Sequence, residues 1–320
     1  MLNIGIDIGG TRIKTGLLRD SKIIASSVLD VTDSVSLENE LPRIESQIHK
    51  MLGVHRVRDK NGTWEKIDGT GIALPCIVDT AGKRILSEYV KYRDAARTDI
   101  EGWVRRVWDT GYSVENDARA ALIGESQFGA CRGADNVVLI TIGTGIGTAV
   151  LLDGKLLRGR NYLAGNLGGH MCIDYKGSRC NCGDTGCAET VGSSWALPGR
   201  FGSLPGNNAL VADGVVDFEY LFSAANENNQ PAKELLNDCI RAWSAVMKNL
   251  IYAYDPEVIV LSGGVSASSG IIIPLLQKEI DNLSWLNSDS PKIVAAQHPD
   301  LAGVMGAAWL SGEFLLNRDI

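Results

Sequence analysis

The stretch from His170 to Glu189 constrains this chain most, because it sets three closely spaced cysteines shortly after a histidine. Cys180 and Cys182 flank a single residue, and Cys187 follows within a glycine-rich turn. Zinc takes four nitrogen and sulfur ligands in closed tetrahedral structural sites, and thiolates favour it over hard cations such as magnesium. The pattern therefore predicts a structural zinc site. The alternative is a disulfide pair with spare thiols, although a one-residue spacing disfavours a bridge between Cys180 and Cys182.

Length and composition narrow the class of protein. A chain of 320 residues is long enough for two domains of about 150 residues each. A net charge of −7 argues against a nucleic-acid-binding surface. No signal-like segment and no run of about 18 apolar residues stands out, so we expect a cytoplasmic protein that does not enter a membrane. Seven cysteines, an odd number, fit reduced thiols and a metal site better than a disulfide framework. The cysteines outside the cluster are expected to be buried packing residues: Cys76, Cys131, Cys172 and Cys239.

A glycine turn lies near the amino terminus. The apolar run Leu2 to Asp7 breaks at Gly9-Gly10-Thr11, and Ile13 to Leu18 resumes as a second strand. Backbone amides without side chains can cradle a phosphate here, together with the Thr11 hydroxyl, and Asp7 would face a metal ion. An ordinary hairpin turn is the alternative reading of the same residues.

A second strand, turn and strand repeat this pattern about 130 residues later. Val137 to Thr141 leads into Gly143 to Gly147, and Thr148 to Leu152 follows. The repetition predicts a duplicated domain in which each half presents a phosphate-facing turn to a shared cleft. A third glycine turn, Ser262-Gly263-Gly264, follows the strand Val258 to Leu261 and precedes a helix expected from about Ile271.

Asn116 and Asp117 stand between a short expected strand, Tyr112 to Val114, and an expected helix, Ala118 to Glu125. Side chains at such a strand end face the ligand crevice in α/β folds. Asn and Asp are also the preferred residues at the start of a helix, and the local pattern by itself favours this capping role.

Taken together, these motifs resemble the ROK family of sugar kinases and repressors, which shares its fold with hexokinase, actin and the Hsp70 ATPase. The resemblance covers nearly the whole chain. It rests on five segments: the first turn, Asp7 to Lys14; the catalytic segment, Val114 to Ala118; the second turn, Ile142 to Gly147; the sugar and zinc signature, Ala164 to Glu189; and the adenosine segment, Ser262 to Val265.

The resemblance implies an α/β fold of two ribonuclease H-like domains with mixed sheets, a cleft between them and a zinc knuckle in the second domain. We expect a smaller domain at 1–115, a larger one at 116–300, and a C-terminal helix at about 301–320 that packs back on the first. It further implies a cytoplasmic homodimer that binds a small sugar and ATP.

The resemblance also assigns roles to single residues. Asp117 is implied as the catalytic base, and His170 as a ligand of both zinc and sugar. The remaining implied contacts are Asn116, Asn166 and Glu189 with the sugar; Cys180, Cys182 and Cys187 with zinc; Asp7 with Mg²⁺; and Asp7, Gly9, Gly10, Thr11, Lys14, Thr144, Gly145, Gly263 and Gly264 with ATP.

The sequence departs from the family pattern just before the histidine. Asn166 stands where the family has a glutamate, and one extra glycine precedes His170. An amide donates as well as accepts hydrogen bonds, which puts plain glucose specificity in doubt and suits a different hydroxyl pattern or an acylated amine. A second departure is Cys76 after Pro75, where the family often has glycine.

The expected reaction is transfer of the γ-phosphate of ATP to a hydroxyl, O6, of a hexose or N-acylhexosamine. The alternative is a non-catalytic sugar sensor. Repressors of the family carry a DNA-binding segment ahead of the first turn, and the first expected strand here begins already at Leu2. A sensor is also expected to lose the aspartate that is present as Asp117.

Overall fold

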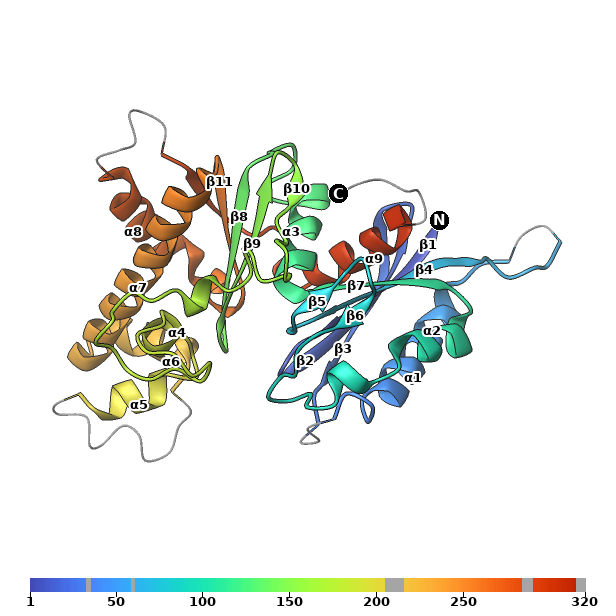
Figure 1. The fold of residues 1–320 in the computed structure, drawn as a ribbon, viewed down its shortest axis with the longest axis horizontal. Helices are drawn as coiled ribbons and strands as arrows, with labels where there is room; N and C mark the ends of the chain where they lie inside the picture. The colour runs from blue at the N-terminus through green and yellow to red at the C-terminus, as the bar shows by residue number, and fades with distance from the viewer. Residues whose placement is uncertain (33–35, 59–60, 205–215, 284–289, 315–320) are drawn as a thin grey trace. The chain divides into compact units, whose positions relative to one another are not determined.

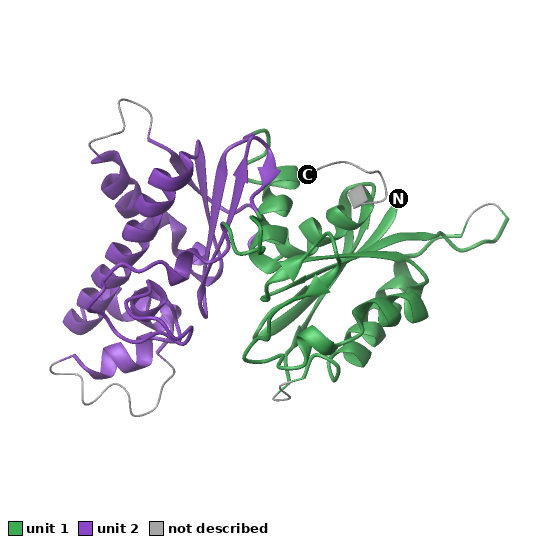
Figure 2. Ribbon diagram, in the orientation of Figure 1, with its two compact units in different colours: residues 1–133, 158–164, 300–320 green, residues 134–157, 165–299 purple. Residues whose placement is uncertain are grey.

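The computed structural model describes residues 1–32, 36–58, 61–204, 216–283 and 290–314, and the chain divides into two compact units. Unit 1 comprises residues 1–133, 158–164 and 300–320, and unit 2 comprises residues 134–157 and 165–299 (Figure 2). This division differs from the boundary expected at 115/116. The helix that begins at Asp117 belongs to unit 1, because it packs against the C-terminal helix of the same unit.

Unit 1 is built on a five-stranded mixed sheet of order β3-β2-β1-β4-β7 (Figure 1). The first three strands form antiparallel hairpins, whereas β4 and β7 run parallel to β1. Its elements are β1 (Leu2–Ile8), β2 (Arg12–Arg19), β3 (Lys22–Asp30), α1 (Leu41–His55), β4 (Ile67–Leu74), β5 (Val78–Asp79), β6 (Arg84–Ile85), the 3-10 helix η1 (Ala95–Arg97), α2 (Ile100–Trp108), β7 (Gly111–Asn116), α3 (Asp117–Phe128) and α9 (Ala302–Phe314).

Alternation along β1 separates the two faces of this sheet. Ile4, Ile6 and Ile8 are fully buried in a core that they share with α1 and α2. Gly5 and Asp7, which point the other way, lie against α9. A buried strand with apolar residues on one face and small or acidic residues on the other therefore places Asp7 on the α9 side.

Unit 2 repeats the same strand pattern with its own five-stranded sheet of order β10-β9-β8-β11-β12. Again a run of antiparallel strands is joined to two parallel ones, as the predicted duplication requires. Its elements are β8 (Val137–Ile142), β9 (Ile146–Leu152), β10 (Lys155–Leu156), η2 (Gly168–His170), α4 (Glu189–Gly192), α5 (Leu197–Gly202), α6 (Phe218–Asn226), α7 (Gln230–Tyr254), β11 (Val258–Ser262), η3 (Gly264–Ser268), α8 (Ser269–Asp281) and β12 (Lys292–Ala295).

Two local expectations need adjustment. The strand expected at Tyr112 to Val114 extends to Asn116, because its parallel pairing with β4 continues to the pair Leu74 and Asn116. The helix expected from Ile271 begins at Ser269 and is preceded by the 3-10 turn η3. Among the described residues, no helix is both long and apolar enough to cross a membrane.

Helix α9 makes backbone-to-backbone contact with α3. A Cβ atom added at Gly306 would lie 1.8 Å from the carbonyl oxygen of Ala120, which is far inside van der Waals contact. The two helices can approach this closely only because Gly306 has no side chain.

We expect Gly306→Ala to destabilise the protein by about 2 kcal/mol or more, since the helices must separate. The matched control is Gly53→Ala, in the exposed part of α1, where an added Cβ meets nothing within 4 Å. This control should stabilise the protein by roughly 0.5–1 kcal/mol through helix propensity. Urea unfolding measures both, and equal effects of the two changes would contradict the close contact.

Candidate active site and metal centre

Four side chains predicted to bind zinc come together in unit 2. The ligand atoms of His170, Cys180, Cys182 and Cys187 all lie within 4.8 Å of one another. The His170 Nδ1 atom is 3.7 Å from Cys180 Sγ, and the sulfur atoms of Cys182 and Cys187 are 3.6 Å apart. A zinc tetrahedron with bonds of about 2.3 Å has edges of roughly 3.8 Å, so the cluster has the size that zinc requires.

The loop that carries the cysteines is shaped by glycine. Gly186 has φ of +77°, and a Cβ atom there would lie 1.7 Å from the carbonyl oxygen of Asp174. The Gly186 carbonyl in turn accepts a hydrogen bond of 2.8 Å from the Ile173 amide. Only glycine allows this turn, which places Cys187 next to the other ligands.

Burial makes these thiols dependent on a cation. Desolvation raises the pKa of both the Cys180 and the Cys187 thiol, and the neighbouring thiols of the cluster raise that of Cys187 further. A thiolate at such a position requires a nearby positive charge, which a bound metal ion supplies. The donor set and its surroundings thus fit zinc.

The other four cysteines are only partly as expected. Cys76, Cys131 and Cys239 are buried, whereas the prediction for Cys172 was wrong, because this side chain is exposed. It lies on the same loop as the cluster, in a bridge opposite Cys187. All seven cysteines are free thiols in the structure, so the disulfide alternative receives no support.

Glu189 connects the loop of the cysteine cluster to the second glycine turn. Its Oε1 atom accepts a hydrogen bond of 2.7 Å from the Ile146 amide, and its Oε2 atom accepts one of 3.2 Å from Trp195 Nε1. A Cβ atom at Gly145 would lie 2.6 Å from Glu189 Oε1. The Ile146 amide, expected to be part of a phosphate cradle, is therefore already engaged by this carboxylate.

The second and third glycine turns lie side by side in unit 2. The Cβ position of Gly143 is 3.9 Å from the Gly264 amide nitrogen. Gly263 has φ of +83°, and its Cβ position is 2.4 Å from the Ile142 carbonyl oxygen. Thr144, between Gly143 and Gly145 in the sequence, is exposed. Two segments separated by more than a hundred residues thus form one glycine-lined surface.

Asn166 is placed unusually for an amide. Its side chain is only 6% exposed, yet neither its Oδ1 nor its Nδ2 atom has a hydrogen-bond partner among the described residues. A buried amide without partners costs about 1–3 kcal/mol, so this position favours a ligand that supplies the missing partners.

Asp7 lies in unit 1 at the amino-terminal end of α9. A Cβ atom at Gly303 would be 2.6 Å from Asp7 Oδ2, so the carboxylate rests on the first turn of this helix. Desolvation and the charge of Asp117 raise the pKa of Asp7 to about 7, although Lys14, its register partner on β2, opposes this shift. Lys14 also forms an ion pair with Asp300 at 3.2 Å. A carboxylate with a raised pKa beside a second carboxylate is an oxygen donor suited to Mg²⁺.

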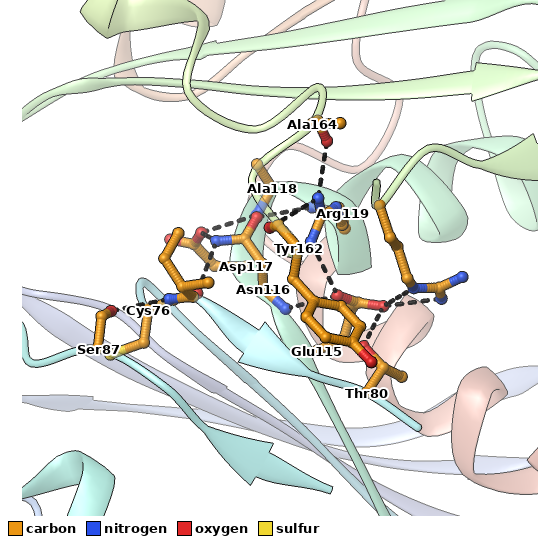
Figure 3. A network of polar contacts seen from close by, with 12 residues as sticks. Cys76, Thr80, Ser87, Glu115, Asn116, Asp117, Ala118, Arg119, Tyr162 and Ala164 are labelled. Atoms are coloured by element: carbon orange, nitrogen blue, oxygen red, sulfur yellow. Dashed lines mark hydrogen bonds and ion pairs between the residues drawn. The ribbon is translucent and has the colours of Figure 1, made fainter. Parts of the chain in front are cut away.

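Asn116 and Asp117 are the residues around which a polar network is built (Figure 3). Asn116 caps α3 by accepting a hydrogen bond from the Arg119 amide, which confirms the capping role. Its contact with a sugar stays a prediction. Asp117 Oδ1 accepts hydrogen bonds from Asn116 Nδ2 at 3.0 Å and from the Ala118 amide at 2.8 Å. Desolvation raises the pKa of Asp117, and these two bonds oppose the rise.

Cys76 belongs to the same surroundings. Its carbonyl oxygen accepts a hydrogen bond of 3.3 Å from Asn116 Nδ2. Burial and the charge of Asp117 raise the pKa of the Cys76 thiol to about 12, so it stays neutral. The departure from the family pattern at this position thus places a neutral thiol beside the aspartate.

Sequence reasoning missed two tyrosines at the first glycine turn. Tyr92 donates a hydrogen bond of 2.7 Å to the Gly9 carbonyl, and the Tyr89 hydroxyl lies 2.7 Å from the Cβ position of Gly10. The turn itself is closed by a bond of 3.0 Å from the Gly9 amide to the Arg12 carbonyl. Both tyrosines follow β6 in a loop without a recognisable motif, so no signal in the sequence pointed to them.

The predicted site residues thus form two groups, one in each unit. Unit 1 brings together Asp7, Gly9, Gly10, Thr11, Lys14, Asn116 and Asp117. Unit 2 brings together Thr144, Gly145, Asn166, His170, Glu189, Gly263, Gly264 and the three cysteine ligands. Their meeting across a shared cleft stays a prediction.

Comparison with known proteins gives consistent matches along nearly the whole chain. The model of the ROK family matches residues 3–313. A glucokinase of Thermotoga maritima is 30% identical over 318 residues, which cover 95% of this chain and 95% of that enzyme. The xylose repressor of Bacillus subtilis is 25% identical over 280 residues, or 88% of this chain and 68% of the repressor.

A solved structure agrees with the fold. The crystal structure of a ROK family glucokinase from Streptomyces griseus, in complex with glucose and AMPPNP, superposes with a TM-score of 0.77. The identity is 27%, and the match covers 98% of this chain and 100% of that one. The α/β fold with mixed sheets is therefore that of a ROK protein.

We expect the purified protein to contain one zinc ion per chain and Cys187→Ser to lose it, because a buried thiolate ligand is removed. The matched control is Cys172→Ser, which changes an exposed thiol on the same loop and should keep full zinc content. Elemental analysis by mass spectrometry measures both. Loss of zinc from both variants, or from neither, would contradict the four-ligand assignment.

We expect Asp7→Asn to stabilise the magnesium-free protein more at pH 8 than at pH 5. The folded carboxyl keeps its proton up to about pH 7, whereas the unfolded one loses it near pH 4. The folded state therefore binds more protons in this window, and its free energy of unfolding falls as pH rises. The increase in the free energy of unfolding caused by Asp7→Asn should be roughly 1–3 kcal/mol larger at pH 8 than at pH 5, after allowing for partial exposure of the side chain. Urea unfolding at the two pH values measures it. An equal gain at both pH values would contradict the raised pKa.

Proposed function

The chain belongs to the ROK family, and on that premise we propose that it is an ATP-dependent sugar kinase that phosphorylates a hydroxyl, O6, of a hexose or N-acylhexosamine. The observation that carries the proposal is the pairing of Asp117 with Asp7 in one unit. One carboxylate can accept a proton while the other attracts a cation, which is the division of labour that phosphoryl transfer from ATP requires.

Asp117 is the proton acceptor in this proposal. The sugar hydroxyl oxygen forms a bond to the γ-phosphorus as the bond from that phosphorus to the β–γ bridging oxygen breaks, and the hydroxyl proton passes to Asp117. ADP leaves with the electron pair of the broken bond. Burial raises the pKa of Asp117, which makes the carboxylate a stronger base than an exposed one, and the hydrogen bonds from Asn116 and Ala118 hold its orientation.

The phosphates of ATP are assigned to the glycine turns. Gly9, Gly10 and Thr11 offer amides and a hydroxyl in unit 1, while Thr144, Gly145, Gly263 and Gly264 line the joined turns of unit 2. Lys14 adds a positive charge near Asp7. Asp7 would hold the Mg²⁺ that binds with ATP, which would neutralise charge on the phosphates.

The sugar is assigned to residues beside the metal centre. His170 directs Nδ1 to the cysteine cluster, which leaves Nε2 for a sugar hydroxyl. Glu189 packs against Gly169, next to this histidine, and begins α4 two residues after the ligand Cys187. Zinc in the closed site would be structural, and its binding would fix the orientation of the imidazole and of Glu189.

Asn166 is the residue we assign to the choice of sugar. Its buried amide offers one acceptor and two donors that no described residue uses. A carboxylate at the same place would offer acceptors alone. Donors at this position favour a substrate with an acceptor such as an acyl carbonyl, and the sugars compared below test this preference.

A sugar sensor without catalysis is the alternative, because the xylose repressor is also a relative. A sensor needs the sugar contacts but no proton acceptor. The arrangement of Asp117, held by two hydrogen bonds at the start of α3, favours the kinase.

The proposal is tested by measuring ADP release with ATP and Mg²⁺ across glucose, N-acetylglucosamine, N-acetylmannosamine, mannose, fructose and allose. We expect turnover of about 1–100 per second with the preferred sugar. Sugar binding without any ADP release would favour the sensor instead. An acylated hexosamine as the best substrate would support the role of Asn166, and equal use of glucose and its acylated analogues would not.

We expect Asp117→Asn to lower kcat by about 10²–10⁴-fold while leaving the sugar Kd within about threefold, since it removes the proton acceptor but keeps the shape. The control is Asp153→Asn, an exposed position in the αL region that asparagine tolerates. Steady-state kinetics and calorimetry measure the two quantities. Substantial kinase activity in the Asp117 variant would rule out this assignment.

A further inference from the structure

The segment Arg158–Ala164 belongs to unit 1 although the chain on both sides of it belongs to unit 2. We call this segment the strap. It is closed on itself by a hydrogen bond of 3.1 Å from the Ala164 amide to the Arg158 carbonyl. Its last residue is one peptide bond from Gly165, which has φ of +79° and precedes Asn166. The strap is therefore the point from which the proposed sugar-binding segment departs.

Two arginines hold the strap to the catalytic segment. Arg119, on the first turn of α3, is 0% exposed and donates from one nitrogen to the carbonyls of Tyr162 and Ala164, at 3.1 and 2.7 Å (Figure 3). Arg158, within the strap, donates from Nε and from its terminal nitrogen to Glu115 Oε2, at 3.0 and 2.8 Å. The strap is thus bound both through its backbone and through its side chain.

Glu115 is the common partner of these contacts. Its side chain is 1% exposed, and it stands two residues before Asp117. Oε1 accepts a hydrogen bond of 3.0 Å from the Asn116 amide and lies 3.7 Å from Arg119, while Oε2 also accepts one of 3.0 Å from Thr80. A buried carboxylate requires such partners, and its charge is balanced here by two guanidinium groups.

The strap is also held in a strained conformation. Tyr162 has φ of +59°, a left-handed value that costs a non-glycine residue of order 1 kcal/mol. Its hydroxyl interacts with the Asp79 carboxylate, which Arg84 contacts at 2.8 Å. Strain of this kind persists only where the surroundings fix it, and four contacts on a loop of seven residues do so.

We propose that Arg119, Arg158 and Glu115 are positioning residues for sugar binding: by fixing the strap, they fix where the segment carrying Asn166 and His170 begins. None of the three needs to touch the sugar. This inference rests on the proposed function for the identity of the ligand. It goes beyond that function because it makes sugar affinity depend on the buried charge network of Glu115, Arg119 and Arg158, beside Asp117.

The test compares Arg158→Met with a matched control, Arg19→Met. Arg19 also donates from Nε and a terminal nitrogen to one carboxylate, Glu65, and the two side chains are similarly exposed, at 18% and 27%. Arg119→Met is less suitable, because Arg119 is 0% exposed within α3 and its loss would also disturb the packing of that helix. Tyr162→Phe serves as a milder second variant that removes only the hydroxyl that interacts with Asp79.

Calorimetry would measure the Kd of the sugar that the wild type prefers and, separately, the Kd of AMPPNP. We expect Arg158→Met to weaken sugar binding by about tenfold or more, since two charge-assisted hydrogen bonds are lost. Arg158→Lys, which keeps the positive charge on a single nitrogen, should recover part of this loss, and Tyr162→Phe should weaken binding by a smaller factor. AMPPNP affinity should stay within about twofold in every variant, and Arg19→Met should change neither ligand.

Three results would overturn the inference. The first is unchanged sugar affinity in folded Arg158→Met. The second is an equal loss of sugar affinity in Arg19→Met. The third is an equal loss of AMPPNP affinity in Arg158→Met, which would indicate general destabilisation. Sugar affinity can be measured without turnover. A wild type that binds sugar without releasing ADP would therefore contradict the proposed kinase activity but not the positioning role of the three residues. A wild type that binds none of the six sugars would contradict both the proposed kinase activity and the positioning role.

Discussion

The close approach of α9 to β1 and α3 is the contact on which the proposed chemistry of unit 1 depends. At Gly5, Gly124 and Gly306 the Cβ atom of any other residue would lie about 2 Å from a backbone oxygen. This packing sets the start of α9 against Asp7 and brings α3, with Asp117 at its first position, into the same unit. Burial at this place, together with the charge of Asp117, raises the pKa of Asp7.

Unit 2 differs from unit 1 in that its proposed ligand contacts lie on loops rather than on strands. A loop of this kind needs an internal constraint. The four-ligand cluster supplies one, and Glu189, two residues beyond the last ligand, joins it to the turn between β8 and β9 through the Ile146 amide. The four-ligand cluster is therefore joined to the surface on which we place the sugar, and Asn166, with no hydrogen-bond partner among the described residues, lies on the segment before it.

Much of this arrangement was predictable, because short motifs fix local geometry. The cysteine spacing predicted the cluster, and the repeated glycine turns predicted two similar sheets. Other features depend on long-range packing that spacing does not encode. Tyr89 and Tyr92 reach the first turn from a loop without a motif, α3 joins unit 1 through its contact with α9, and Arg119 holds a strap more than forty residues away. The exposure of Cys172, which is bridged to Cys187 on the neighbouring segment, is likewise set by how the loop folds and not by the spacing of its cysteines.

The central claim is that the carboxylates of unit 1 and the metal-supported loop of unit 2 serve one transfer of phosphate to a sugar. Phosphorus-31 NMR of the reaction with ATP, Mg²⁺ and the preferred sugar tests it most directly. The account predicts a new phosphomonoester signal coupled to the two protons of the primary carbon, at O6, appearing together with ADP. A signal from a ring or anomeric phosphate, or ATP that stays intact while the sugar is bound, would contradict it.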